Sequence, residues 1–197
     1  AGVLWAGSDD GFVQVSRDNG ASWTKVTPPG LPEFALISII DPSPHDPATI
    51  YVGAHMLMKS TDKGRSYAPI SPDLSTNTNR ETLSIMNVSD KEVRVAKNDG
   101  VTTWGTIVTL EESARRAGVI WTGTDAGVVS VTRDAGKTWA NVTANFGGVP
   151  KWTYVADVVP SQHADGTAYL AFDGHRGGDY GTYAFVTTDF GATARSI

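Results

Sequence analysis

Residues 1–23 read AGVLWAGSDDGFVQVSRDNGASW, and residues 117–139 read AGVIWTGTDAGVVSVTRDAGKTW. Thirteen of these 23 positions are identical at an offset of 116 residues. Most of the other positions hold conservative pairs, such as Leu4 and Ile120. The two stretches are therefore predicted to be copies of one structural unit.

The similarity continues weakly beyond these two stretches. The letters PSPH at 42–45 correspond to PSQH at 160–163, and Tyr51 corresponds to Tyr169, both at an offset of 118 residues. Self-similarity at a fixed period is the sequence signature of a repeat architecture. The whole chain is therefore predicted to be built from repeated units.

A shorter motif, Ser/Thr-x-Asp-x-Gly-x-x-aromatic, occurs three times in full and once with Ala194 in the aromatic position. Each copy lies between short runs that alternate apolar and polar residues, such as 12–16 and 23–26 around the first copy. Alternation with a period of two residues favours half-buried strands, and Asp-x-Gly is typical of a hairpin turn. The copies contain Ser16, Asp18, Gly20 and Trp23; Ser60, Asp62, Gly64 and Tyr67; Thr132, Asp134, Gly136 and Trp139; and Thr187, Asp189 and Gly191.

The chemistry of this motif suits a turn better than a reaction. An Asp carboxylate can accept hydrogen bonds from the backbone N–H groups of the turn, and Gly tolerates a positive φ. The aromatic side chain can pack back over the hairpin. A catalytic acid has no reason to be copied into every hairpin, so the four aspartates are predicted to be structural, and no catalytic residue is assigned among them.

The repeated motif resembles the Asp-box, or BNR repeat. This repeat marks the β-propellers of sialidases, xyloglucan-degrading hydrolases, sortilin-type receptor ectodomains and photosystem II assembly factors. The resemblance covers nearly the whole chain apart from 72–103. It is narrower with large bacterial sortilin-like proteins labelled as glycosyl hydrolases, through WGTI at 104–107 and VIW at 119–121. It implies an all-β propeller with blades of four antiparallel strands.

On this plan the chain forms about four blades, with an irregular insertion between the second and the third. The first blade has only its three outer strands, and the innermost strand of the second blade is expected over 35–40. We expect a segment of a larger propeller, or an open arc completed by a partner. Its exposed apolar faces and unpaired strand edges would favour association. The expected blades are 1–27, 34–71, 104–143 and 152–197, and the insertion is 72–103, in which 82–88 and 92–96 either pair as a hairpin or remain irregular.

Composition excludes several classes of function. The 197 residues include no cysteine, which rules out disulfides, a thiol nucleophile and a thiolate zinc site. Sixteen Lys and Arg against 21 Asp and Glu give a net charge of −5, and no basic cluster suited to nucleic acid is present. The longest apolar runs, such as 35–40, are far too short to cross a bilayer. Four scattered histidines do not have the spacing of a metal site, and neither a metal nor a cofactor is predicted.

The binding surface is expected at the end of the propeller opposite the Asp-box turns. Both irregular segments fall at that end, and functional loops gather at one end of a rigid scaffold. The insertion at 174–181 combines two potential interface anchors with two further polar groups, in a glycine-rich context. It is either a contact loop or a solvated hairpin tip, and its candidate binding residues are His175, Arg176, Asp179 and Tyr180.

If the protein is an enzyme, its catalytic groups have to come from the residues outside the repeated motif. A sialidase-like site needs arginines for the substrate carboxylate and a tyrosine nucleophile with a carboxylate partner. A two-carboxylate glycosidase needs a pair about 5–10 Å apart. Asp157 and Asp173 are the pair available for the second scheme. The candidates for the first, which form no recognisable motif, are Arg94, Arg176, Asp173, Asp179 and Tyr180.

The sequence therefore favours a non-catalytic protein–protein interaction module. The resemblance implies an extracytoplasmic accessory or assembly subunit of a larger complex, which could be a membrane-bound photosynthetic one. The partner would be that complex or the remainder of a larger propeller. The alternative is a glycoside hydrolase or a carbohydrate-binding propeller.

Overall fold

The computed structural model describes residues 2–32, 35–78, 84–85, 88–89, 92 and 105–197. Within these residues the chain is almost entirely β-structure, with two short 3₁₀ turns at Thr143–Asn145 (η3) and His175–Gly177 (η4). The strands form one sheet of three strands, three sheets of four strands and one small two-stranded ladder. No helix in the described part of the chain is long and apolar enough to cross a membrane.

Each of the large sheets is a simple antiparallel meander in chain order, as expected for a propeller blade. Within the described residues, blade 1 has three strands and each of the other blades has four. The strands of blade 1 are β1 (Leu4–Gly7), β2 (Val13–Ser16) and β3 (Thr24–Lys25); of blade 2, β4 (Ile39–Pro42), β5 (Ile50–Gly53), β6 (Leu57–Ser60) and β7 (Ala68–Pro69); of blade 3, β10 (Ile107–Glu112), β11 (Ile120–Thr124), β12 (Val129–Thr132) and β13 (Ala140–Asn141); and of blade 4, β14 (Tyr154–Pro160), β15 (Ala168–Asp173), β16 (Tyr183–Thr187) and β17 (Arg195–Ser196).

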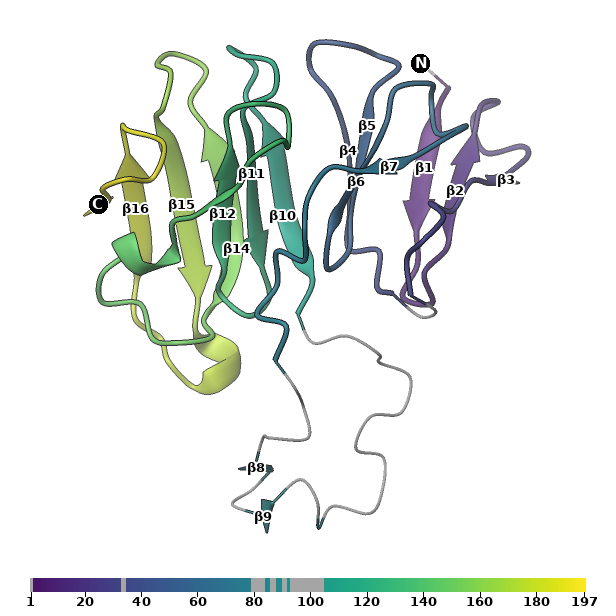
Figure 1. The fold of residues 1–197 in the computed structure, drawn as a ribbon. Coiled ribbons are helices and arrows are strands. Elements are labelled where there is room, and N and C mark those ends of the chain that lie inside the picture. Colours follow the sequence, from purple (N-terminus) through teal and green to yellow (C-terminus); the bar gives the residue numbers. More distant parts are fainter. Residues whose placement is uncertain (1, 33–34, 79–83, 86–87, 90–91, 93–104) are drawn as a thin grey trace.

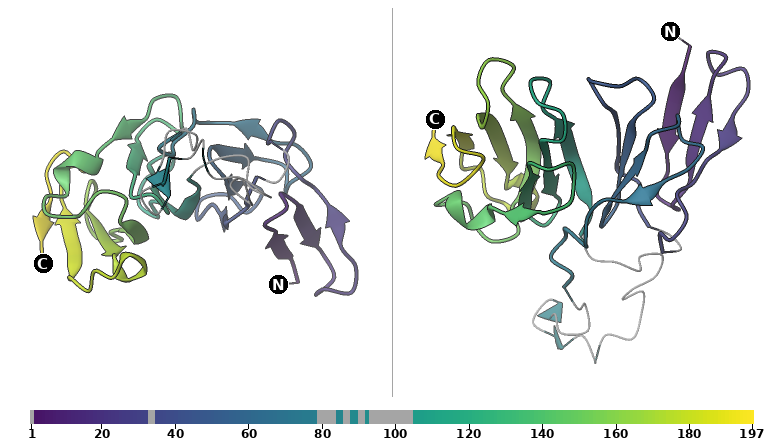
Figure 2. Two further views of the ribbon diagram at one scale, coloured as in Figure 1. Left: turned by 90° about the horizontal axis from the view of Figure 1, so that it is seen from below. Right: turned by 45° about the horizontal axis from the view of Figure 1, so that its top comes forward.

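The four blades stand side by side in chain order (Figure 1). Seen along the blades, they form an open arc whose two ends are blade 1 and blade 4 (Figure 2). The fold class is therefore a β-propeller, present here as an arc of four blades.

The innermost strand of blade 2 begins four residues later than the sequence pattern predicts. Strand β4 starts at Ile39, whereas the alternation predicted a strand from Ala35. Ala35 and Ile37 are buried, but they pack in the core between blades 1 and 2. The N–H of Ile37 donates to the carbonyl of Ser8 in blade 1 at 3.1 Å. The segment thus follows the first blade before it enters the second, and burial gives it the apolar pattern of a strand.

Most of the predicted insertion at 72–103 lies outside the described residues. Within it, β8 (Ser84–Ile85) pairs with β9 (Val88–Ser89) as a two-residue ladder. This ladder pairs residues within 84–89, whereas the hairpin suggested by the sequence would pair 82–88 with 92–96.

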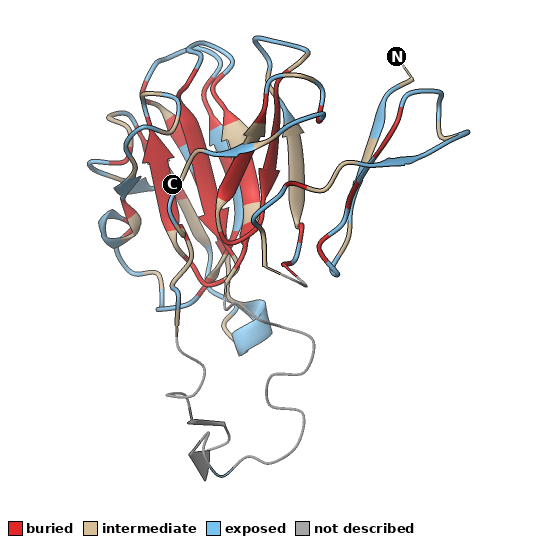
Figure 3. Cartoon of the chain, turned by 45° about the vertical axis from the view of Figure 1, so that its right-hand side comes forward, coloured by how far each residue is buried: buried red, intermediate tan, exposed pale blue. Residues whose placement is uncertain are grey.

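Three apolar clusters fill the spaces between neighbouring blades. Blades 1 and 2 share a cluster that includes Val13 and Val52, and blades 2 and 3 share one that includes Tyr51 and Ile120. The largest cluster lies between blades 3 and 4 and contains Trp121 with three phenylalanines. Burial is concentrated on the strands in the middle of the arc, whereas β1 is largely exposed (Figure 3). The three phenylalanines of the cluster between blades 3 and 4 are Phe146, Phe172 and Phe185.

The four turns that carry the repeated Ser/Thr-x-Asp-x-Gly motif, which we call the Asp-box turns after the resemblance, share one hydrogen-bond pattern. In the first, Asp18 Oδ1 accepts from the Ser16 hydroxyl at 2.8 Å and from the Ser22 N–H at 2.9 Å, and Asp18 Oδ2 accepts from the Ser22 hydroxyl at 2.6 Å. The Gly20 N–H donates to Ser16 Oγ at 2.7 Å. Asp62, Asp134 and Asp189 repeat these bonds in their own turns. The aspartates therefore fold against their own main chain.

Two backbone features complete each turn. The residue after each Asp has a positive φ near 60°, and the Gly that follows is also left-handed. Hydrogen bonds from the neighbouring hydroxyl and N–H lower the pKa of Asp18, Asp62 and Asp134 to about 2. At neutral pH these carboxylates therefore stay ionised and keep their hydrogen bonds to the turn.

Candidate functional site

Three connections meet at the end of the arc opposite the Asp-box turns. They are the β11–β12 turn around Asp125, the β13–β14 connection at 150–153, and the β15–β16 connection at 174–182. Together they line two neighbouring cavities. We call the larger one, of about 320 Å³, the polar cavity, and the smaller one, of about 210 Å³, the apolar cavity.

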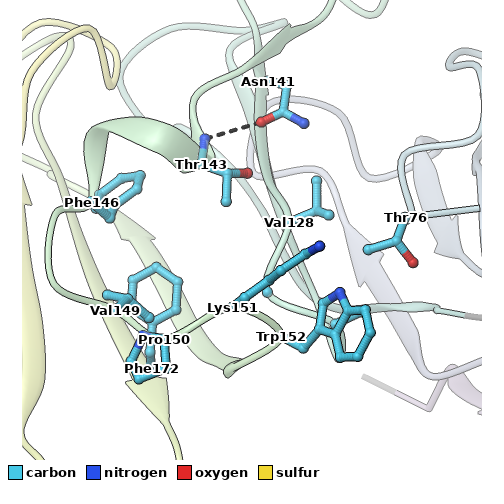
Figure 4. A pocket seen from close by; sticks show the side chains of 12 residues that line it. Thr76, Val128, Asn141, Thr143, Phe146, Val149, Pro150, Lys151, Trp152 and Phe172 are labelled. Carbon is cyan, nitrogen blue, oxygen red and sulfur yellow. Dashed lines mark hydrogen bonds between the residues drawn. The ribbon is translucent and has the colours of Figure 1, made fainter. Parts of the chain in front are cut away.

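Trp152 belongs to both cavities. It lines each of them together with Pro150 and Lys151. Its side chain is 47% exposed, and the Lys151 ammonium lies 5.1 Å from the centre of its ring. Phe146 and Thr76 also line the apolar cavity, and Trp152 lies on the Thr76 side of it, away from Phe146 (Figure 4). A large aromatic surface is therefore presented at the boundary of two cavities.

The backbone at Trp152 is held in an unusual conformation. The N–H and the hydroxyl of Thr153 both donate to the carbonyl of Pro150, at 3.3 and 2.8 Å, which closes a four-residue turn. Trp152 occupies the third position of this turn with φ +68°. Gly or Asn normally takes a left-handed position of this kind. Strain at a bulky residue costs about 1–3 kcal/mol and is concentrated at functional sites.

The carboxylates of the polar cavity have unequal environments. Burial raises the pKa of Asp125, whose Oδ1 accepts from the Thr106 N–H at 2.8 Å. By contrast, hydrogen bonds from His175 lower the pKa of Asp173. The Tyr183 hydroxyl, which donates to Asp179 Oδ2 at 2.6 Å, lowers the pKa of Asp179. The cavity thus combines one half-buried carboxyl with two carboxylates that accept hydrogen bonds.

A cation and an aromatic ring complete the wall of the polar cavity. The Arg176 guanidinium lies 4.6 Å from the centre of the Tyr154 ring. Its charge also lowers the pKa values of Asp125 and Asp173, as a secondary effect. An arginine stacked on a ring keeps its N–H groups available to a ligand.

The structure separates the four loop residues that the sequence singles out. Arg176 and Asp179 line the polar cavity. His175 points to the outside, where its ring contacts the Asp173 carboxylate. Tyr180 is the most exposed of the large hydrophobic side chains among the described residues and lines neither cavity.

Of the residues named for an enzymatic site, the structure brings Asp173, Arg176 and Asp179 together in the polar cavity and leaves Tyr180 and Asp157 outside it. Arg94 lies outside the described residues. Asp157 is on β14, where its Oδ1 accepts from the Thr109 hydroxyl of blade 3 at 3.1 Å, so of the pair Asp157 and Asp173 only the second lines the polar cavity. In the described part of the chain, no three His, Asp or Glu side chains gather as metal ligands would.

Sequence reasoning missed most of the residues that line these cavities. Asp125, Lys151, Trp152 and Tyr154 stand in connections or at a strand end, where the pattern shows nothing beyond a turn. The one local signal is a tryptophan and a lysine after Pro150, between two strands. The hydroxyls at the seventh position of each Asp-box were also missed, although all four copies have one there: Ser22, Ser66, Thr138 and Thr193.

The known structures most informative about this fold are propellers. An ancestral GH74 enzyme superposes with a TM-score of 0.64 and 21% identity over 99% of this chain, and the GH74 xyloglucanase from Xanthomonas campestris with 0.63 and 21% over 99%. YCF48 from Cyanidioschyzon merolae superposes with 0.50 and 16% over 89%. The chain spans only 22% and 28% of the two GH74 chains and 43% of the YCF48 chain.

These similarities establish the propeller fold. No protein-family model matches the sequence, and no curated protein matches it significantly. The neighbours include GH74 enzymes and YCF48, and a shared fold does not determine function.

Proposed function

We propose that this chain is a non-catalytic binding module that holds a protein partner at the polar and apolar cavities. The observation that carries the proposal is Trp152, which is half-exposed, fixed at a positive φ and shared by both cavities. Tryptophan, tyrosine and arginine are the residues most enriched at the energetic centres of protein interfaces. Trp152, Tyr154 and Arg176 bring all three types to one place.

The chemistry of the two cavities specifies what such a partner presents. The apolar cavity is lined by Val128, Phe146 and Phe172 and accepts an aliphatic or aromatic side chain. The polar cavity beside it offers the carboxylates of Asp125 and Asp173 to a basic side chain. A partner segment with an apolar residue next to a lysine or arginine fits both.

The more specific form of the proposal is an extracytoplasmic accessory or assembly subunit of a larger complex. It is supported by fold similarity to the extracellular domain of BT4673 from B. thetaiotaomicron, at a TM-score of 0.59 and 14% identity, and to YCF48. Fractionation of the source organism tests the location: recovery with the cytoplasmic fraction would contradict this form and leave the binding role untouched.

The binding role is tested by comparing variants that remove one anchor each. Trp152→Ala and Arg176→Ala are each expected to weaken capture of the partner from the source organism by at least tenfold, about 1.4 kcal/mol or more. Phe12→Ala, which truncates an exposed aromatic on blade 1, is the matched control and should leave capture unchanged. Equal capture by all three variants would contradict the proposal.

A second candidate is glycoside hydrolysis, which one observation favours. Asp125 and Asp173 line the same cavity and have pKa values displaced in opposite directions, as an acid and a base in one site would. Assays on xyloglucan, other β-glucans and sialosides test it. Turnover that disappears in both Asp125→Asn and Asp173→Asn, while Asp157→Asn keeps it, would replace the non-catalytic proposal.

A further inference from the structure

A cavity of about 300 Å³ lies between blades 3 and 4, beside the Asp-box turn of blade 4. We call it the box cavity. Val131 and Val142 line it from blade 3, and Phe190 lines it from the blade 4 turn. Among the described residues it shares no lining side chain with the polar cavity or the apolar cavity. The box cavity is therefore separate from the surface used in the proposed function.

The Asp-box of blade 4 lacks the aromatic residue that the other three boxes have. Ala194 stands at the position of Trp23, Tyr67 and Trp139. Its side chain faces blade 3, because it packs against the cluster between blades 3 and 4. A methyl group therefore replaces a ring at the joint of these two blades.

The joint of blades 1 and 2 shows where a box aromatic lies. A Cβ atom placed on Gly64 would be 2.9 Å from the Tyr67 hydroxyl oxygen, so this ring reaches back over its own turn. Burial raises the pKa of Tyr67 to about 12, and the charges of Asp62 and Arg17 act on it as smaller effects. The ring therefore lies between the Asp-box of blade 2 and the arginine of blade 1.

The counterparts of these two charged residues line the box cavity. Arg133 corresponds to Arg17, and Asp189 corresponds to Asp62. The Arg133 guanidinium lies 5.1 Å from the centre of the Phe190 ring. The box cavity is thus the space between blades 3 and 4 that corresponds to the space filled by a box aromatic between blades 1 and 2.

The joint of blades 2 and 3 shows which bond a ring makes in this position. Trp139 packs against the cluster between these blades, and its indole N–H donates to the Ile70 carbonyl at 2.8 Å. Val142 is the counterpart of Ile70, because each directly follows the outer strand of its blade. The Val142 carbonyl accepts from the Asn145 N–H at 3.0 Å, and a carbonyl can accept a second hydrogen bond. An acceptor for an indole N–H is therefore present at the box cavity.

We propose that the box cavity binds a planar aromatic group of the indole type, in the space that Ala194 leaves open. The ring packs on the valines of blade 3, and its N–H donates to the Val142 carbonyl. The Arg133 guanidinium is placed for a cation–π contact with it. This group can come from a free small molecule or from a tryptophan side chain.

Calorimetric titration with indole tests the proposal on the whole chain. The wild type is expected to show saturable binding. Ala194→Trp and Ala194→Tyr supply the ring from the chain itself, so each should weaken indole binding by at least about tenfold. Both should also raise the melting temperature, because filling a cavity stabilises a fold.

Two further variants keep the test independent of a changed core. Arg195→Trp is the matched control, because Arg195 pairs with Val186 on the opposite face of the sheet from Phe185 and should leave indole binding unchanged. Arg133→Ala, at an exposed position, should weaken indole binding by about threefold through loss of the cation–π contact. Circular dichroism checks that each variant is folded.

Titration with N-acetyltryptophanamide distinguishes the two sources of the ring. Binding of both probes supports a ring carried by a protein chain, and binding of indole alone supports a free aromatic molecule. A wild type that binds neither probe would overturn the proposal. So would undiminished indole binding in the folded Ala194 variants and in Arg133→Ala, because the ring would then bind elsewhere.

Discussion

At the scale of single residues, the hydroxyl that opens each Asp-box is as important as the aspartate. Ser60 is buried, donates to Asp62 Oδ1 at 2.8 Å and accepts from the Gly64 N–H at 2.8 Å. Removal of this group leaves a buried backbone N–H without an acceptor. The turn then loses the bond that holds its left-handed Gly64 in place.

Ser60→Ala is therefore expected to lower the free energy of unfolding by about 1–3 kcal/mol, the usual cost of a buried unsatisfied polar group. Ser60→Thr should cost much less, because two of the other boxes have threonine at this position. Urea denaturation of the three proteins measures the difference. Equal losses in Ala and Thr would show that volume, and not the hydroxyl, decides stability here.

A half-buried carboxyl between blades 2 and 3 makes the stability depend on pH. Burial and the neighbouring Glu112 raise the pKa of Asp41 to about 6, and the Oδ2 atom of Asp41 is buried without a hydrogen-bond partner. The folded pKa is above the unfolded one, so this contribution to stability is complete below about pH 3.8 and is lost as the pH rises through 6.

Asp41→Asn is expected to make the protein more stable at pH 7, by about 1 kcal/mol after allowance for solvent screening. The gain should shrink between pH 6 and pH 4, where Asp41 itself becomes neutral. Asp9→Asn, at an exposed position, is the matched control. A gain that stays constant from pH 4 to 7 would contradict the assignment to Asp41.

Some single residues could be predicted from the sequence and others could not. The Asp-box residues carry their geometry in a local pattern, because the side-chain hydrogen bonds of the turn join residues at most four positions apart. Trp152 and Asp125 come from different blades, and only the folded arc brings them to one cavity. No spacing in the sequence encodes that meeting.

At the scale of elements, close contact between neighbouring blades depends on glycine. Gly123 lies on β11, and a Cβ atom there would approach Thr109 Cγ2 of β10 to 2.7 Å and press against Val155 of β14. Neither neighbour has free space, since Val155 is completely buried. The inner strands of blades 3 and 4 therefore need a residue without a side chain at this point.

Gly123→Ala is expected to destabilise the protein by about 1–3 kcal/mol through overpacking. Gly147→Ala is the matched control, because a Cβ atom there meets nothing within 4 Å and its φ is not left-handed. Thermal unfolding of both variants provides the comparison. A neutral Gly123→Ala would mean that the two blades can separate at no cost.

Strand type was predictable, but one strand boundary was not. The strands of all four blades were predicted by placing the alternating runs on the propeller plan that the resemblance implies, and the longer strands have one face in a core between blades. The same signal failed at 35–38, where Ala35 and Ile37 are buried by the join between two blades and not by a strand of their own. A periodic pattern records burial and does not say which sheet supplies it.

At the scale of the whole molecule, stability is divided among the spaces between blades. The cluster between blades 3 and 4 contains Phe146, Phe172 and Phe185, whose ring centres are 5.6–5.9 Å apart. Blades 1 and 2 contribute nothing to this cluster. A repeat protein of this kind is stabilised mainly by contacts between nearest neighbours.

Phe185→Ala is therefore expected to cost about 3–5 kcal/mol at the junction of blades 3 and 4. Hydrogen exchange should accelerate in β14, β15 and β16, and amides of β5 and β6 should keep most of their protection. Uniform acceleration over all blades would instead show that the arc unfolds as one cooperative unit.

The propeller architecture was predictable from the repeat, whereas its ligand was not. Four copies of one turn motif determine the fold because each needs the same hairpin and the same blade. A binding site is made once, from connections that the repeat leaves free to vary. The polar cavity illustrates this, since its lining residues Lys151, Trp152 and Arg176 have no counterparts in the repeated motif.

The offsets of 116 and 118 residues make a pair of blades, and not a single blade, the module of this architecture. Odd and even blades differ at their boundaries, as Leu4 and Ile120 on odd blades and Tyr51 and Tyr169 on even ones show. A blade of the odd type placed after blade 4 would reproduce the joint between blades 2 and 3, whereas a blade of the even type placed there would bring two surfaces of the same kind together. Any extension of this arc is therefore expected to alternate the two types of blade.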